Sequence, residues 1–307
     1  MVFKKLGLVF RASDHTSSWA KHSALTPTPV LHPDGHIRVY AGFRDDTGIS
    51  RIGYVDLNPD NPLEVLDVSA QPVLDIGTDG CFDDNGVILG DVVWHEGRWH
   101  MFYVGFQLVK KAKFLAFTGL ALADAQGERF ERASPAPILG RAAGQTTIGA
   151  VHTALFDEGR WKLWFARGDG WELMNGTPYP QYEICYCEAT NLLEVPRNGQ
   201  LCIAPTAPEY RIGRPRVYKT PAGFEMYYTK GTTTGEYFPG KALSSDGVRW
   251  QRQDDTFELA LSDTGWDSQH LCYPAFLNVK GKRYAFYNGN NMGVDGFGVA
   301  VAETEGL

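Results

Sequence analysis

Short apolar segments alternate with polar ones along the chain, and one arrangement recurs five times: an apolar strand, a turn containing glycine, and a strand rich in aromatic residues. Alternation of this kind predicts β-strands rather than helices. The aromatic strands are Ile37–Phe43, Trp99–Gly105, Trp161–Arg167, Phe224–Lys230 and Arg283–Gly289. Their central aromatic residues follow at intervals of 63, 62, 63 and 59 residues, and the turn glycines at 62, 62, 64 and 58. Two landmarks with one period indicate an internal repeat.

Each repeat continues into a third strand, and a fourth is visible in places, as at Phe130–Arg132. Four short strands per repeat are typical of a β-propeller blade, whose faces are buried by stacking on neighbouring blades in a closed ring. We therefore predict an all-β fold, a five-bladed β-propeller, with residues 1–307 as a single domain. The predicted blades are 22–75, 82–135, 146–200, 210–255 and 266–307. Segments between second and third strands, such as Gly168–Gln181, are predicted to be loops on one face of the ring.

Composition narrows the class of protein. The 307 residues are 43 % hydrophobic and 21 % charged, which excludes a disordered or fibrous chain. The net charge of −7 and the lack of a basic stripe argue against a nucleic-acid partner. The early apolar run Leu6–Phe10 is far too short to span a membrane or to act as an export signal. Five cysteines show no metal-ligand spacing and are expected to be reduced, so we expect a cytoplasmic protein.

Several motifs carry a resemblance to a known superfamily. They are Phe43-Arg44-Asp45, Phe82–Val87, Arg214-Pro215, Gly265–Ser268, Cys272–Pro274, Tyr287–Asn290 and Gly296–Gly298. With them the chain resembles the five-bladed propeller glycoside hydrolases, and within these a family 43-like group often found among bacterial polysaccharide-biosynthesis proteins. The resemblance covers nearly the whole chain. It implies hydrolysis by two carboxylates on the innermost strands, roughly 6.5–9.5 Å apart, near the mouth of the central channel.

The innermost strands depart from that pattern. The first blade has no Asp where the family's general base would stand, and the third has no Glu where its general acid would stand. Other acids and histidines on or near these strands become the catalytic candidates, because a carboxylate and an imidazole can exchange protons near neutral pH. These candidates are Asp83, Asp84, His152, His22 and Glu183.

Three histidines lie near the channel ends of blades one, three and five, namely His22, His152 and His270. With a carboxylate they would hold a divalent cation in the central channel. The resemblance implies a similar cation near a histidine of the last blade, which corresponds loosely to His270. The alternative is that each imidazole forms hydrogen bonds within the core. No other cofactor is predicted.

A further set of polar and aromatic residues is predicted to bind substrate. A guanidinium on an inner strand matches a carboxylate or phosphate, Trp171 would stack on a sugar ring, and Asn or Asp side chains bind sugar hydroxyls. The set is Arg44, Asp45, Asp91, Trp171, Arg214, Asp267, Tyr273, Asn288 and Asn290. Internal ion pairs for the arginines, and turns or ring closure for the asparagines, are the alternatives.

These observations leave three functions open. The first is an enzyme that hydrolyses or transfers a sugar or sugar conjugate at the channel mouth, with Arg214 as the anchor for an anionic group. The second is a propeller that only binds a sugar, or that serves as an assembly partner in surface-polysaccharide synthesis. The third is a metal-dependent enzyme that uses the three histidines. The expected partner is a small molecule or an oligosaccharide.

Overall fold

A computed structural model describes residues 3–15 and 17–303, and within this part the strands form three sheets of four, twelve and four strands. By antiparallel pairing they fall into five groups, three of which are joined into the twelve-stranded sheet by short parallel pairs. The first group is β2 (His22–Leu31), β3 (Ile37–Arg44), β4 (Ser50–Leu57) and β5 (Val65–Val68). The second is β6 (Val87–His95), β7 (Arg98–Gln107), β8 (Leu115–Ala123) and β9 (Glu131–Arg132). The third is β10 (Ile148–Asp157), β11 (Arg160–Met174), β12 (Thr177–Ala189) and β13 (Gln200–Ile203).

The fourth group is β14 (Glu209–Thr220), β15 (Gly223–Thr232), β16 (Tyr237–Ser244) and β17 (Gln251–Arg252). The fifth is β18 (Cys272–Val279), β19 (Lys282–Asn288), β20 (Phe297–Glu303) and, from the other end of the chain, β1 (Lys4–Phe10). Three short helical segments complete the described residues: η1 (Ala12–Asp14), η2 (Asp254–Thr256) and α1 (Asn290–Gly293). No helix in the described ranges is long and apolar enough to cross a bilayer.

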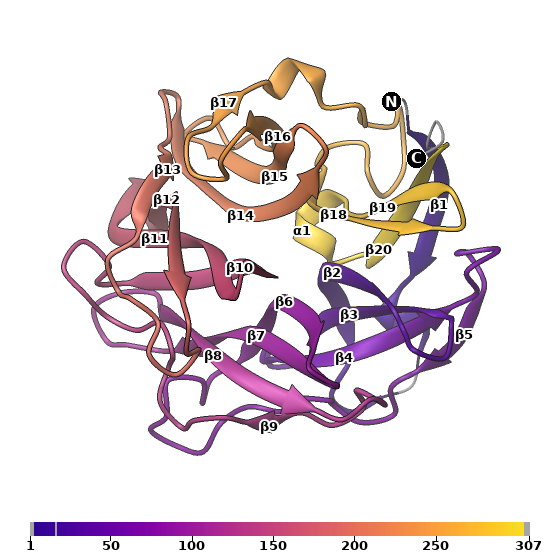
Figure 1. The fold of residues 1–307 in the computed structure, drawn as a ribbon, viewed down its shortest axis with the longest axis horizontal. Helices are drawn as coiled ribbons and strands as arrows, with labels where there is room; N and C mark the ends of the chain where they lie inside the picture. Colours follow the sequence, from indigo (N-terminus) through magenta and orange to yellow (C-terminus); the bar gives the residue numbers. More distant parts are fainter. Residues whose placement is uncertain (1–2, 16, 304–307) are drawn as a thin grey trace.

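The five groups follow one another around a ring (Figure 1). This arrangement is the predicted all-β propeller, and the number of groups is consistent with the five predicted blades. The ring is closed by strand pairing between the two ends of the chain, because β1 is antiparallel to β20, with Lys4 opposite Val301. In Figure 1 the indigo β1 therefore lies beside the yellow β20. The repeat in the sequence did not predict Lys4–Phe10 as a strand of the last group.

The large aromatic residues of the second strands are buried between neighbouring groups. Tyr40 and Tyr103 lie in one apolar cluster that joins the first and second groups, and Trp164 and Tyr228 lie in another that joins the third and fourth. All four side chains are less than 2 % exposed. Burial of such side chains is the main favourable term that holds the ring together.

The innermost strand of each group contains a β-bulge. These strands are β2, β6, β10, β14 and β18. The register shifts lie between Leu25 and Thr28, Leu89 and Asp91, Val151 and Thr153, Gly213 and Arg216, and Cys272 and Ala275. A bulge leaves its extra residue unpaired and turns that side chain out of the regular alternation. In four of the strands the unpaired residues include Thr26, His152, Arg214 and Tyr273, whereas in β6 the unpaired residue is Gly90, which has no side chain.

One predicted loop is wrong. Most of Gly168–Gln181 belongs to the long hairpin of β11 and β12, in which Trp171 is paired with Pro180. The ladder continues past the expected strand end after a register shift between Arg167 and Gly170.

Candidate functional site

A pocket of about 390 Å³ lies at the axis, and every group of strands contributes to it. Four of its lining residues are the bulge residues Thr26, His152, Arg214 and Tyr273. Three of these four have a left-handed backbone, with φ of 55° at Thr26, 58° at Arg214 and 56° at Tyr273, and each precedes a proline. This conformation costs a residue with a side chain about 1 kcal/mol or more, and such strain collects at binding sites.

Three arginines line the pocket without an acidic partner. Arg44 ends β3, and Arg211 and Arg214 lie on β14. Among the described residues no carboxylate oxygen lies within 4.0 Å of their guanidinium nitrogens, and no Asp or Glu lines the pocket. Tyr273 interacts electrostatically with all three. The Nε atoms of Arg44 and Arg211 are buried and have no hydrogen-bond partner. The pocket is therefore cationic and has unused donors.

Aromatic rings surround Arg211 in place of acids. Its guanidinium carbon lies 4.7 Å from the ring centre of Tyr237, 5.0 Å from that of Tyr210 and 5.9 Å from that of Tyr182. The backbone explains the last contact, because Tyr182 of β12 pairs in parallel with Arg211 at the junction of the third and fourth groups. Cation–π attraction offsets part of the cost of burying the charge but leaves its donors available to a ligand.

His152 is the buried titratable imidazole of the pocket, at 4 % exposure. Burial, together with the nearby Arg214 and Arg216, holds its pKa well below the usual value. The ring is therefore neutral at pH 7, and its Nδ1 has no hydrogen-bond partner. Beside it, Tyr237 donates a hydrogen bond to the Tyr273 hydroxyl at 3.0 Å. Burial raises the pKa of both phenols, so both stay protonated.

Of the predicted site residues, the structure brings Arg44, His152, Arg214 and Tyr273 together in the pocket. Arg214 also donates to the Leu89 carbonyl at 2.6 Å and lies 5.1 Å from the ring centre of Tyr273. The pocket residues that the sequence did not indicate include Lys113, Tyr182 and Arg211. The only available signal for Arg211 was its position three residues before Arg214 on the same inner strand.

Asp91 does not line the pocket. It lies on the inner strand β6 and forms hydrogen bonds with the inner strands β10 and β14. Its Oδ1 accepts a hydrogen bond from Arg216 of β14 at 2.6 Å, and its Oδ2 accepts one from the Ala154 amide of β10 at 2.9 Å. Arg216 also donates to Thr28 of β2. Both Asp91 oxygens accept hydrogen bonds within the protein. These contacts support a structural role for Asp91 in place of the predicted substrate-binding role.

Asp83 and Asp84 also lie outside the pocket lining. Asp83 is 1 % exposed and pairs with Arg132 at 2.7 Å. It fits between two glycines, since a Cβ on Gly77 would lie 2.0 Å from its Oδ1 and a Cβ on Gly105 would lie 2.4 Å from its own Cβ. Asp84 accepts from the Gly80 amide at 2.8 Å, which closes a turn. The Oδ1 of Asp84 is buried and has no hydrogen-bond partner. Among the described residues, neither carboxylate forms an ion pair with the three arginines.

Unlike Tyr273, three predicted residues of the last group, Asp267, Asn288 and Asn290, lie outside the pocket lining. Asn288 donates to the carbonyls of Ala24 and Gly296 and accepts from the Thr26 amide, each at 2.8 Å. Asp267 accepts from Lys5 at 2.6 Å and from the Tyr287 hydroxyl at 3.0 Å. Asn290 accepts from the amides of Gln269 and His270. Ring closure is thus the alternative that the contacts of Asn288 support.

Three further predicted residues are occupied elsewhere. Glu183 pairs with Arg167 across β11 and β12 at 2.5 Å. Asp45 closes a turn; burial alone would raise its pKa, but hydrogen bonds from Thr47 and Arg51 lower it to about 2. Trp171 packs edge-on against Phe114, a pocket residue, at 5.5 Å between ring centres.

The predicted metal ligands do not converge. His22 contacts the Ser23 hydroxyl at 2.9 Å, and His22 and His270 lie outside the pocket lining. Among the described residues, the trio of potential ligands whose atoms come within 4.8 Å of one another is His32, Asp34 and His36. The rings of His32 and His36 are stacked at 4.4 Å with a 20° tilt. Lone pairs in nearly parallel planes do not point to one ion, so this trio does not fit a metal as it stands.

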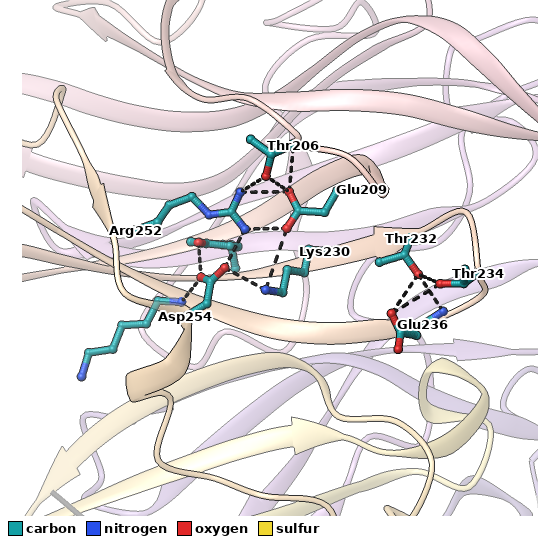
Figure 2. Close-up of polar contacts among 10 residues, drawn as sticks. Thr206, Glu209, Lys230, Thr232, Thr234, Glu236, Arg252 and Asp254 are labelled. Carbon is teal, nitrogen blue, oxygen red and sulfur yellow. Dashed lines mark hydrogen bonds and ion pairs between the residues drawn. The ribbon is translucent and has the colours of Figure 1, made fainter.

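The fourth group holds a contrasting set of charges away from the pocket (Figure 2). Arg252 contacts Glu209 at 2.5 Å and Asp254 at 2.6 Å, and Lys230 contacts Asp254 at 2.7 Å. Thr206 donates its backbone amide to Glu209 at 2.9 Å. Each cation of this network is paired with a carboxylate, so the network stabilises the fold of the fourth group.

Sequence comparison finds one group of relatives at low identity. No family model matches the chain. The "Uncharacterized protein Rv1502" of Mycobacterium tuberculosis is 27 % identical over 305 residues, which are 99 % of this chain and 100 % of that protein. The similarity therefore runs along the whole length of both chains.

Solved structures give the fold. A glycoside hydrolase superposes with a TM-score of 0.72 at 18 % identity and covers 100 % of this chain and 93 % of its own. A thermostable family-43 glycoside hydrolase gives 0.68 at 13 % identity over 94 % and 92 %. A β-1,2-mannobiose phosphorylase from Listeria innocua gives 0.70 at 12 % identity over 99 % and 96 %. The chain therefore has the all-β propeller fold that these carbohydrate-active enzymes share.

Proposed function

We propose that the protein binds a carbohydrate derivative that carries an anionic group, such as a sugar phosphate, in the axial pocket. The observation that carries this proposal is the set of three half-buried arginines with no carboxylate beside them. A planar guanidinium pairs best with a carboxylate or phosphate, and an uncompensated cluster of cations in a partly desolvated site is costly unless a ligand neutralises it.

Hydrolysis by a carboxylate pair is not the function that this pocket supports. That mechanism needs two acidic side chains on either side of the glycosidic bond. Asp83, Asp84, Asp91 and Glu183 each pair within the protein or close a turn, and none of them lines the pocket. Of the functions left open by the sequence, a propeller that binds its sugar without hydrolysing it fits this geometry best.

A second function is favoured by His152 and by the mannobiose phosphorylase among the similar structures. An oxygen of a phosphate held by the arginines would attack the anomeric carbon, so that a bond between this oxygen and the carbon forms as the glycosidic carbon–oxygen bond breaks. The phosphate's proton would pass through the free Nδ1 of His152 to the departing oxygen. This reaction predicts release of a sugar 1-phosphate that stops in His152→Gln.

Calorimetric titration tests the binding proposal. Mannose 1-phosphate and inorganic phosphate should bind, whereas methyl mannoside, which is neutral, should bind at least tenfold more weakly. Arg44→Gln should weaken phosphate binding about tenfold or more, since charge-assisted hydrogen bonds contribute about 1.5–3 kcal/mol. Arg98→Gln is the matched control, because Arg98 is exposed and lies outside the pocket. Equal affinity for neutral and anionic sugars, or no binding of either, would overturn the proposal.

A further inference from the structure

One part of the pocket lining, called here the apolar wall, is formed by aliphatic and aromatic side chains. A buried cluster of Val104, Ala116, Ile148, Ala150 and Ala166 packs with Ile88, Phe106 and Phe114, and all of these residues line the pocket. They come from the second and third groups of strands. The arginines come from the first and fourth groups, and Tyr273 comes from the fifth. The second and third groups are neighbours in the ring (Figure 1), so the apolar residues gather on one side of the pocket. The arginines adjoin this side, because Tyr182 packs on the apolar cluster and Arg214 donates to the carbonyl of Leu89, next to Ile88.

The apolar wall offers nothing to a sugar hydroxyl. The side chains of Ile88, Val104 and Ile148 have no hydrogen-bonding group, so a hydroxyl placed against them would lose its water without gaining a partner. Such a loss costs about 1–3 kcal/mol per group. An aliphatic group in the same place gains about 0.8 kcal/mol per methylene removed from water.

The apolar lining continues to the mouth of the pocket. Leu108 is 64 % exposed and Met292 is 44 % exposed, and both line the pocket. Lys113, which also lines the pocket, and the exposed Lys110 and Lys111 lie on the same loop as Leu108. An aliphatic chain longer than the wall would therefore pass over Leu108 and Met292, while the lysines attract an anion toward the arginines.

We infer that the ligand is an amphipathic anion, a sugar derivative whose phosphate-type group is joined to an aliphatic chain. The inference rests on the proposed anion-binding function and adds the second half of the ligand. The anionic group contacts Arg44, Arg211 and Arg214. The chain lies along the wall formed by Ile88, Val104 and Ile148.

Alkyl phosphates of increasing length test the inference. In calorimetric titrations of the full chain, affinity should rise from inorganic phosphate through methyl and butyl to hexyl phosphate, by about two- to fourfold per methylene that reaches the wall. Hexanol, which has the chain without the anion, should bind at least a hundredfold more weakly than hexyl phosphate. An affinity that does not change with chain length would overturn the inference while leaving phosphate binding, and hence the proposed function, intact. Absence of all phosphate binding would instead refute the proposed function.

A pair of variants separates the wall from the arginines. Ile88 is half-buried and faces the pocket, so Ile88→Thr keeps the β-branched shape and places a hydroxyl on the wall. It should weaken hexyl phosphate binding at least fivefold and change inorganic phosphate binding less than twofold. Val93→Thr is the control, because Val93 is a half-buried residue of the same strand outside the pocket. Equal losses for both ligands in Ile88→Thr would overturn the inference.

Sedimentation with vesicles identifies the source of such an ester. If the aliphatic chain of the ligand belongs to a bilayer lipid, the protein should cosediment with phosphatidylcholine vesicles that contain phosphatidic acid. Hexyl phosphate binding without cosedimentation supports a free ester. Cosedimentation that Ile88→Thr leaves unchanged, together with unchanged hexyl phosphate binding, would overturn the role of the wall.

Discussion

Two arginines of the fourth group show how the same side chain serves two purposes. Arg252 contacts the carboxylates of Glu209 and Asp254, whereas Arg211, on β14, has four tyrosine rings within 6.0 Å of its guanidinium and no carboxylate. Both side chains are partly buried. The difference is whether the protein itself neutralises the charge, as it does for Arg252 (Figure 2). A neutralised cation stabilises the fold, and a cation without an acid is available to a ligand.

The largest effect on the free energy of unfolding is expected at Asp91, a predicted site residue that instead pairs with Arg216. Asp91→Asn leaves the buried Arg216 without its counter-charge and should lower the free energy of unfolding by about 3–5 kcal/mol. Asp84→Asn should change it by less than about 1 kcal/mol, because Asp84 accepts one hydrogen bond from an exposed turn and its other oxygen has no partner to lose. Denaturant unfolding monitored by tryptophan fluorescence measures both. A small effect of Asp91→Asn combined with lost phosphate binding would return Asp91 to the pocket.

The same substitution in the two arginines should then give different results. Arg252→Met should lower the free energy of unfolding by about 2 kcal/mol, since it leaves Glu209 and Asp254 with only Lys230 between them. Arg211→Met should change it by less than about 1 kcal/mol, because the cost of burying the charge and the cation–π attraction nearly offset each other.

Binding completes that comparison. Arg211→Met should weaken inorganic phosphate at least tenfold, and Arg252→Met should leave the affinity unchanged. The assignment of the two regions fails if Arg252→Met impairs binding as strongly as Arg211→Met does.

The smallest effect concerns pH. The pKa of His152 lies well below 6.5 in the folded protein because the ring is buried next to Arg214 and Arg216. Above pH 6.5 the imidazole is neutral in both states and contributes nothing. Below pH 6.5 the unfolded chain binds a proton that the folded chain does not, so stability falls by up to about 1.4 kcal/mol per pH unit.

The variant His152→Gln isolates this contribution. Unfolding titrations between pH 7.5 and 5 should show a shallower loss of stability than in the parent. His36 and His100, whose pKa values burial also lowers, contribute equally to both proteins. Parallel curves for the two proteins would mean that His152 is not held neutral by the fold.

The sequence determined the propeller, because the cause of the fold is repeated along the chain. Aromatic strands at a constant spacing need neighbours to bury Tyr40, Tyr103 and Trp164, and a ring satisfies all of them together. The sequence also indicated four pocket residues, Arg44, His152, Arg214 and Tyr273, since they lie on inner strands or at the end of the adjacent strand. The single-domain boundaries, the cytoplasmic location and the chemical roles of these residues stay predictions.

Only the tertiary structure decided which polar side chains face the pocket. Asp91 and Arg214 are both charged and both lie at inner-strand bulges. Asp91 forms an ion pair with Arg216 of another strand, whereas Arg214 has no carboxylate beside it and lines the pocket. Pairings such as Lys5 with Asp267, or Asn288 with Ala24, join the two ends of the chain. A side chain is free for a ligand only when no partner from a distant strand satisfies it. Closure of the ring brings such partners together, although they lie more than 260 positions apart in the sequence.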